Sequence, residues 1–321
     1  MNSTFTTKDF ATYSPENVIA ENLQELTERA DLLGELEIAH LGELAVEIAQ
    51  GNDIADLLSS LHDYRIPPIA PRGNVLTNNT ELLLRSRRML EAWQCMILCK
   101  ALYEELRNRE SLLPFLFPDE YEIAPNAKGH IVYQRNSYTD DAYLAFAKLI
   151  PKARAAYAHS FHAACQEVFS GHCEFCILPV ENAVEGELIG FAKLISQYDL
   201  KIAATCDIAG VDASRKTRFA LLRRNMLPLM VSNAKQKNVF RFSLPSQSAP
   251  VVADVLSAAD FFGLTFLSIN TLPIDKEGAV ACFNLTFDIG GADLYPFLLY
   301  LATVAPQYTP IGIYAHIQQK G

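Results

Sequence analysis

LPVENAVEG occupies residues 178–186, and this stretch decides how the middle of the chain folds. The apolar run from Glu174 to Pro179 predicts a buried strand, and the polar residues after it predict a turn into a helix over 186–198. Working outward, the pattern predicts strands at 130–134, 153–157, 200–206 and 218–222 and helices at 140–148 and 161–169. Alternating strands and helices are typical of an α/β layer on a mostly parallel sheet.

The last eighty residues show a second, shorter series of predicted strands and helices. Apolar periodicity predicts strand 239–244, helix 250–262, strands 264–272 and 278–287, helix 294–304 and strand 311–317. This βαββαβ order predicts a ferredoxin-like fold.

The first hundred residues are expected to be helical. Ser14, Pro15 and Glu16 form a helix start signal, and uninterrupted helical periodicity continues to Gln50. A short helix is predicted over 54–64, a proline-rich loop over 67–73 and a second long helix over 79–109. A helix of about 35 residues is about 50 Å long. Because one short neighbour cannot cover its apolar stripe, we expect a homodimer or a higher homo-oligomer.

Composition excludes several classes of protein. The chain has 321 residues, half of them apolar, and a formal net charge of −10. No basic stripe indicates nucleic acid, no apolar run is long enough to span a membrane, and no secretory signal begins the chain. Seven scattered cysteines indicate a reducing cytoplasm. No phosphate-binding glycine motif is present, so no cofactor is expected, and the single CxxC at 173–176 is interpreted as core cysteines rather than a metal site.

Three signatures occur in one order. They are LPVENAVEG at 178–186, KTRF at 216–219 and the βαββαβ tail that opens VFRFSLP at 239–245. Together they resemble the prephenate dehydratase family with its C-terminal ACT domain, and NSYTD at 136–140 resembles the turn after that family's first strand. The resemblance covers residues 130–320. The helical front end is similar to chorismate mutase, so the whole chain resembles a bifunctional chorismate mutase–prephenate dehydratase.

The resemblance implies an α+β multidomain protein. Its expected parts are a three-helix chorismate-mutase-like domain (1–125), a single α/β lobe of dehydratase type (126–236) and an ACT-like domain (237–321). It also implies a site for a prephenate-like carboxylate, in which Thr217 would donate a proton and Arg218 would pair with a carboxylate. The remaining residues implied are Glu181 and Asn182 for orientation, Phe219, Ser137 and Thr139 for substrate binding, and Ser248, Ala249, Asn270 and Thr271 for an aromatic amino acid effector.

Two observations leave the function open. Only the 28 residues 189–216 separate Leu188 from Thr217, so the second lobe of the family is expected to be absent. The segment between Lys8 and Lys100 holds no lysine, so we do not expect mutase activity on a dianion. One hypothesis is a divergent dehydratase that converts prephenate to phenylpyruvate. The other is a non-catalytic regulatory or ligand-sensing relative, and altered chemistry on a prephenate-like acid is a third.

Overall fold

The computed structural model describes residues 15–50, 90–106, 128–210, 216–226, 237–272 and 282–317. A single ten-stranded sheet runs through the α/β region and the C-terminal region in the order β2-β1-β3-β6-β5-β10-β7-β9-β8, with β4 beside β3. The strands are β1 (His130–Gln134), β2 (Arg154–Ala158), β3 (Phe175–Asn182), β4 (Gly186–Glu187), β5 (Lys201–Ala209), β6 (Lys216–Arg223), β7 (Lys237–Pro245), β8 (Thr265–Leu272), β9 (Cys282–Asp288) and β10 (Thr309–Ile317). The helices are α1 (Pro15–Ala49), α4 (Ala92–Leu106), α7 (Ser137–Ala147), α8 (Phe161–Phe169), α9 (Ile189–Gln197), α10 (Ala249–Phe261) and α11 (Tyr295–Val304), with a short 3-10 turn, η1 (Ser246–Ser248).

The α/β region has helices on both faces of its part of the sheet. α7 packs on one face, around Phe146 and Phe175, and α8 and α9 pack on the other, around Cys165 and Leu178. The sheet of this region is mostly parallel in strand direction, as predicted, since β1, β2, β3 and β5 run the same way. β1 is parallel to β2 and β3, but β6 is antiparallel to both β3 and β5. Only six residues separate β5 from β6, and so short a connection joins antiparallel neighbours.

The C-terminal region has the predicted element order. Its strands lie in the order β10-β7-β9-β8, and α10 and α11 cover one face. The core beneath those helices is aromatic, with Phe240, Phe242, Phe287 and Phe297 in mutual ring contact. The opposite face of these strands is turned toward the side of the sheet that carries α9.

One strand joins the two regions. β10 pairs in parallel with β5, Ala315 opposite Ala204, and antiparallel with β7. The approach is so close that a Cβ added at Gly312 would lie 2.4 Å from the carbonyl oxygen of Ile202. The sheet therefore continues across the expected boundary at residue 236, and the division into three domains stays a prediction.

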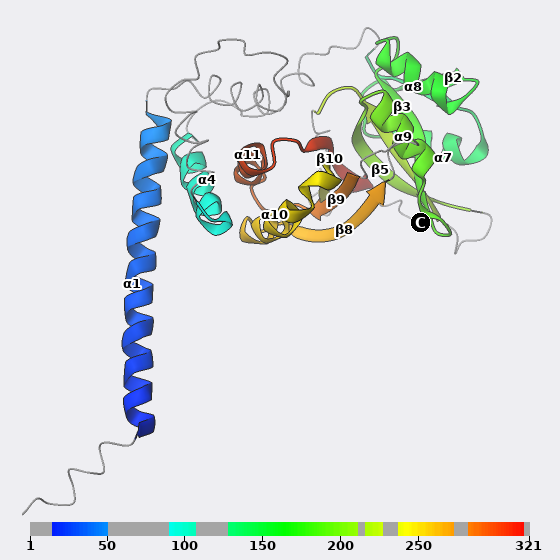
Figure 1. Ribbon diagram of the computed structural model, residues 1–321. Coiled ribbons are helices and arrows are strands. Elements are labelled where there is room, and N and C mark those ends of the chain that lie inside the picture. Colours follow the sequence, from blue (N-terminus) through cyan, green and yellow to red (C-terminus); the bar gives the residue numbers. More distant parts are fainter. Residues whose placement is uncertain are drawn as a thin grey trace, which may run out of the picture.

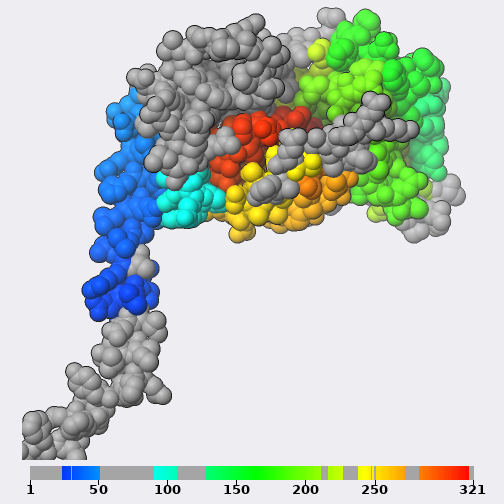
Figure 2. All heavy atoms as spheres, viewed as in Figure 1, coloured from blue at the N-terminus to red at the C-terminus, as the bar shows by residue number. Residues whose placement is uncertain are grey.

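The N-terminal helices pack against the C-terminal region. α1 begins and ends within one residue of its predicted limits, and its last turns share a core with α4 and α11 (Figure 1). Figure 2 shows the C-terminal residues between these helices and the α/β region. The earlier part of α1 leaves Leu26, Leu33 and Leu36 exposed by 50% or more. Their cover by a second copy of the chain stays a prediction.

Two helix predictions are corrected. The helix predicted over 79–109 is not continuous, because Leu90 and Glu91 are not helical. α4 begins at Ala92, and there the Gln94 side chain accepts a hydrogen bond from the Glu91 N–H (2.7 Å). The helix predicted from residue 186 begins at Ile189, because residues 186–187 form β4 and pair with β3. The predicted helix over 54–64, the loop over 67–73 and residues 79–89, 107–109 and 278–281 lie outside the described residues.

Candidate functional site

The sheet divides the predicted catalytic residues between its two faces. Successive residues of a strand point to opposite faces. Phe219 is buried in the core on the α7 side, whereas Ala220 lies in the core on the α8 side. Thr217 therefore shares its face with Phe219 and α7, and Arg218 lies on the opposite face. The proton donor and the cation implied by the family resemblance do not converge.

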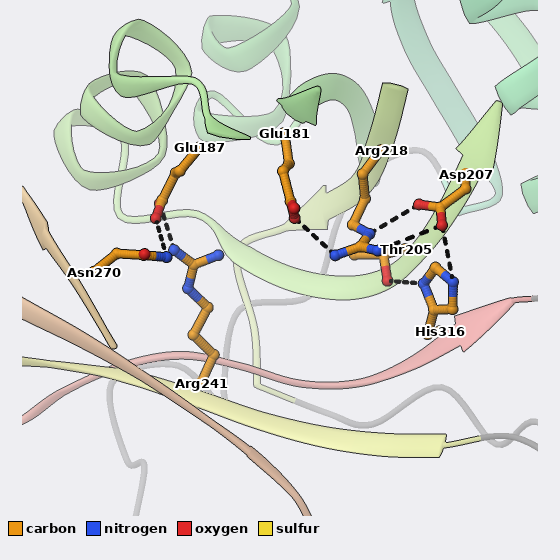
Figure 3. Close-up of polar contacts among 8 residues, drawn as sticks. All are labelled: Glu181, Glu187, Thr205, Asp207, Arg218, Arg241, Asn270 and His316. Carbon is orange, nitrogen blue, oxygen red and sulfur yellow. Dashed lines mark hydrogen bonds and ion pairs between the residues drawn. The ribbon is translucent and has the colours of Figure 1, made fainter. Parts of the chain in front are cut away.

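Arg218 is held by two carboxylates. It lies opposite Glu181 in the β3–β6 pairing and opposite Asp207 in the β5–β6 pairing. Its Nη1 donates to Glu181 Oε2 at 2.7 Å, and its Nε donates to Asp207 Oδ1 at 2.8 Å (Figure 3). We call Arg218, Glu181, Asp207 and His316 the polar seam.

His316 extends the seam onto β10. Its Nε2 lies 3.5 Å from Asp207 Oδ2, and its Nδ1 lies 3.0 Å from the Thr205 hydroxyl. The seam thus joins β3, β6, β5 and β10 on one sheet face. A charge network that links four strands can stabilise their pairing.

Electrostatics favour the charged forms of Asp207 and Arg218. Burial disfavours the Asp207 carboxylate, but hydrogen bonds from His316 and Arg218 outweigh that cost and lower its pKa below the ordinary range. Burial likewise opposes the charge of Arg218, yet the hydrogen bond to Asp207 and the charges of Glu181 and Asp207 raise its pKa. The seam carries two negative charges for the one guanidinium, which leaves no positive excess for an anionic substrate.

Two more of the predicted residues hold local turns. Asn182 Oδ1 accepts from the N–H groups of Val184 (2.9 Å) and Glu185 (2.6 Å), which closes the turn of the LPVENAVEG stretch. The Thr139 hydroxyl donates to the Gln134 carbonyl at 2.7 Å and takes part in a capping box with Asn136 at the start of α7. Ser137 is exposed at the first position of that helix. Side chains engaged in this way position backbone, as Asx turns and caps do.

A cavity of about 710 Å³ lies between α9 and the C-terminal strands. It opens on the same sheet face as the polar seam, where the face of β7 and β9 away from the aromatic core meets the α/β region. Its apolar lining comprises Val180, Ile189, Ala192, Ile195, Leu200, Ile202, Pro245, Pro310 and Ile311. Its volume lies within the range of about 300–1,000 Å³ typical of small-molecule sites.

A buried ion pair forms part of the cavity wall. Arg241 of β7 donates to Glu187 of β4, and each side chain is only 13% exposed. Glu187 also accepts from Asn270 at 2.9 Å (Figure 3). A further hydrogen bond comes from Asn284 at 3.4 Å. The pair joins the α/β region to the C-terminal sheet, and both of its members line the cavity.

The predicted effector residues are only partly linked to this cavity. Asn270 reaches it through Glu187, whereas Thr271 is exposed at the neighbouring position. Ser248 is buried and donates to Gln307 at 3.3 Å, and Ala249 is the first residue of α10. Ser248 and Asn270 bond to different partners, Gln307 and Glu187, and a shared effector site stays a prediction.

Sequence reasoning missed Asp207, His316, Glu187 and Arg241. Two of them carried a usable signal: Asp207 follows an apolar run, and Arg241 alternates with Phe240 and Phe242, as a polar residue on a strand's uncovered face does. The described residues were also searched for a metal site and for a membrane span. No group of three or more His, Cys, Asp or Glu residues able to hold a metal ion occurs in the described ranges.

Within the same ranges, no helix has the length and apolarity needed for a membrane span.

Comparison with known proteins places the relationship in the α/β region. Residues 133–209 match the prephenate dehydratase family. A search of curated proteins finds no match to the chain. Among solved structures, prephenate dehydratase from Streptococcus mutans matches with a TM-score of 0.47 at 23% identity, covering 58% of this chain and 98% of that one.

Two further structures match at a similar level. GqqA, described as a novel type of quorum quenching acylase, has a TM-score of 0.45 at 17% identity, with 59% of this chain and 96% of that chain covered. Prephenate dehydratase in complex with L-Phe from Arthrobacter aurescens has a TM-score of 0.43 at 14% identity, with 58% and 90% covered. Structural likenesses this weak assign no function. The relationship to prephenate dehydratases therefore rests on residues 133–209, which contain Glu181 and Asn182 and end before Thr217 and Arg218.

Proposed function

We propose that this chain is a non-catalytic, small-molecule-binding relative of the prephenate dehydratases. The observation that carries the proposal is the state of Arg218, whose guanidinium contacts both Glu181 and Asp207 on the sheet face opposite Thr217. We propose that the protein acts in the regulation of aromatic amino acid metabolism in the cytoplasm.

The chemistry of dehydration explains why this arrangement counts against turnover. Prephenate is a dianion, and expulsion of its hydroxyl needs a proton donor within hydrogen-bond reach of that group. Here the candidate donor and the candidate carboxylate-binding cation are separated by the sheet. A dianion brought to Arg218 would also face the carboxylates of Glu181 and Asp207, and like charges at such distances repel.

Binding is supported by the cavity beside α9. It is large and mostly apolar, and its lining also includes polar and charged side chains, among them Glu187 and Arg241, which is the usual composition of a ligand site. It is formed by residues of both regions, so a bound molecule would contact both. This is a suitable arrangement for a sensor, because occupancy can stabilise one relative placement of the two regions.

A divergent dehydratase is the second candidate function. The match of residues 133–209 to the family and the presence of Thr217, Arg218 and Phe219 at the start of β6 favour it. In that case, residues of another chain would have to complete the site around Thr217.

The test is phenylpyruvate formation from prephenate by the full-length protein, with Thr217→Ala as the matched variant. We expect wild type and variant to show the same rate as buffer. Turnover by wild type that falls at least a hundredfold in Thr217→Ala would overturn the proposal and establish the dehydratase. Equal turnover by both proteins would indicate a contaminating enzyme, which repurification from a host lacking prephenate dehydratase would remove.

A further inference from the structure

We infer that the cavity between α9 and the C-terminal strands is a site for a zwitterion with an apolar body, of which an α-amino acid with a large apolar side chain is the simplest example. The inference rests on the proposed binding function and adds the position of the site and the orientation of the ligand. It places the site within one chain, in a different position from the predicted effector residues at 248–249 and 270–271.

The apolar part of the ligand follows from the cavity walls. Ile189, Ala192 and Ile195 of α9 face Ile202 and Ile311 of the two strands at the junction. These side chains offer no hydrogen-bonding group, so a polar body placed against them would lose its hydration without compensation. An aromatic or branched aliphatic group would gain about 25 cal/mol per Å² of apolar surface that it buries.

The charges of the ligand follow from Glu187 and Arg241. They are the two charged cavity residues that are largely buried, one of each sign. The guanidinium has five N–H donors, and the carboxylate has about four acceptor positions, of which Arg241, Asn270 and Asn284 use three, so each group retains some capacity. A ligand carboxylate beside Arg241 and a ligand ammonium beside Glu187 would each meet an opposite charge.

The charged residues at the rim of the cavity do not make it a site for a dianion. Asp199 is paired with the buried Lys201 at 2.7 Å, and Lys193 is exposed. Arg241 and Glu187 already neutralise each other, so a monoanion or a dianion would add a net negative charge beside the pair, and a monocation would add a net positive charge. A buried charge without a partner is strongly disfavoured. The ligand class favoured by the wall is therefore the one that carries both charges.

Three probes that share a phenyl ring test the inference. L-phenylalanine carries both charges, 3-phenylpropanoate carries only the carboxylate and phenethylamine carries only the ammonium. Titration calorimetry on the full chain should show L-phenylalanine binding at least ten times more tightly than either single-charge probe. L-leucine tests whether an aliphatic body is accepted as well.

Variants separate the cavity from any other binding site. Ala192→Phe fills the space without touching the charges and should weaken L-phenylalanine at least tenfold. Gly190→Ala on the same helix is the control, since its added carbon meets no atom within 4 Å, and it should bind as wild type does. Glu187→Gln removes the partner of the ammonium, so the preference for L-phenylalanine over 3-phenylpropanoate should fall to about threefold or less.

The outcomes distinguish this inference from the proposed function. If wild type binds 3-phenylpropanoate as tightly as L-phenylalanine, the inference of a zwitterionic ligand is wrong, whereas the proposal that the protein binds a small molecule stands. If Ala192→Phe leaves the affinity for L-phenylalanine unchanged, the ligand lies elsewhere and the inference is overturned. If none of the probes binds and no prephenate is turned over, the inference fails although the absence of catalysis stands. Prephenate turnover alone would overturn the proposed function.

Discussion

Arg218 and Arg241 lie on the same face of one sheet, and each pairs with a glutamate of the α/β region. Arg218 has a second carboxylate partner, is 39% exposed and belongs to the polar seam. Arg241 has one carboxylate partner, is 13% exposed and lines a cavity. The comparison teaches that an arginine of the motif can serve as a structural tie, while an arginine outside any motif lines the cavity that we propose as the ligand site.

Breaking the junction that both sites share should have the largest effect. In Gly312→Ala the added carbon would lie 2.4 Å from Ile202 O and 3.0 Å from Ile202 N, and backbone cannot move away as a flexible side chain can. We expect a loss of about 3 kcal/mol in the free energy of unfolding, measured by urea denaturation. Gly190→Ala is the control and should be neutral or slightly stabilising. A loss of less than about 1 kcal/mol for Gly312→Ala would show that β10 does not depend on this approach to β5.

Removing the cation of the polar seam should have the next largest effect. Arg218→Met leaves Glu181 and Asp207 without their shared partner. The seam side chains are 23–47% exposed, so solvent screens the charges and the expected loss is about 1–2 kcal/mol. Because the cavity does not include Arg218, the affinity for L-phenylalanine should stay within about twofold of wild type. A loss of ligand binding in a folded Arg218→Met protein would instead assign the ligand to the seam.

The destabilisation by Arg218→Met should depend on pH. The folded-state pKa of Asp207 is lowered, so its contribution to stability is present above the ordinary carboxyl pKa of about 4 and is lost as pH falls below that value. Without Arg218 the folded pKa is less depressed, and less stability remains to be lost. The difference in unfolding free energy between wild type and variant should therefore be larger at pH 5.5 than at pH 3. An equal difference at both pH values would show that the pair contributes no ionic stabilisation.

Opening the LPVENAVEG turn should have a smaller effect. Asn182→Ala removes the acceptor for the N–H groups of Val184 and Glu185, both in an exposed turn. The expected loss is about 0.5–1 kcal/mol, measured as a lower Tm. Asn182→Asp keeps an acceptor oxygen and should recover most of the loss. If both variants are equally destabilised, Asn182 acts through something other than this turn.

Removing the Thr217 hydroxyl should have the smallest effect of all. Thr217 is half-buried on the face away from the seam and the cavity. We expect Thr217→Ala to change the unfolding free energy by less than about 0.5 kcal/mol and ligand affinity by less than twofold. A larger change in affinity would return the α7 side of the sheet to the list of candidate ligand sites.

Much of the fold was predictable because its signals are local. Ser160 caps α8 through the Ala163 N–H at 3.1 Å, and the helix has its predicted limits of 161–169. Alternating apolar residues likewise located most of the strands. The candidate site was less predictable, because Arg218 pairs with Glu181, 37 residues earlier, and the face that Arg218 occupies depends on the register of three strands.

The sequence by itself determined the kind and order of most of the described elements, since helix and strand periodicity, caps and turns act within a few residues. Only the tertiary structure decided which strands became neighbours. Backbone N–H and C=O groups are the same in every strand, so the partner of β10 is chosen by side-chain packing and by the space that Gly312 leaves beside Ile202. That choice brings Glu187 and Arg241, 54 residues apart, to one cavity wall.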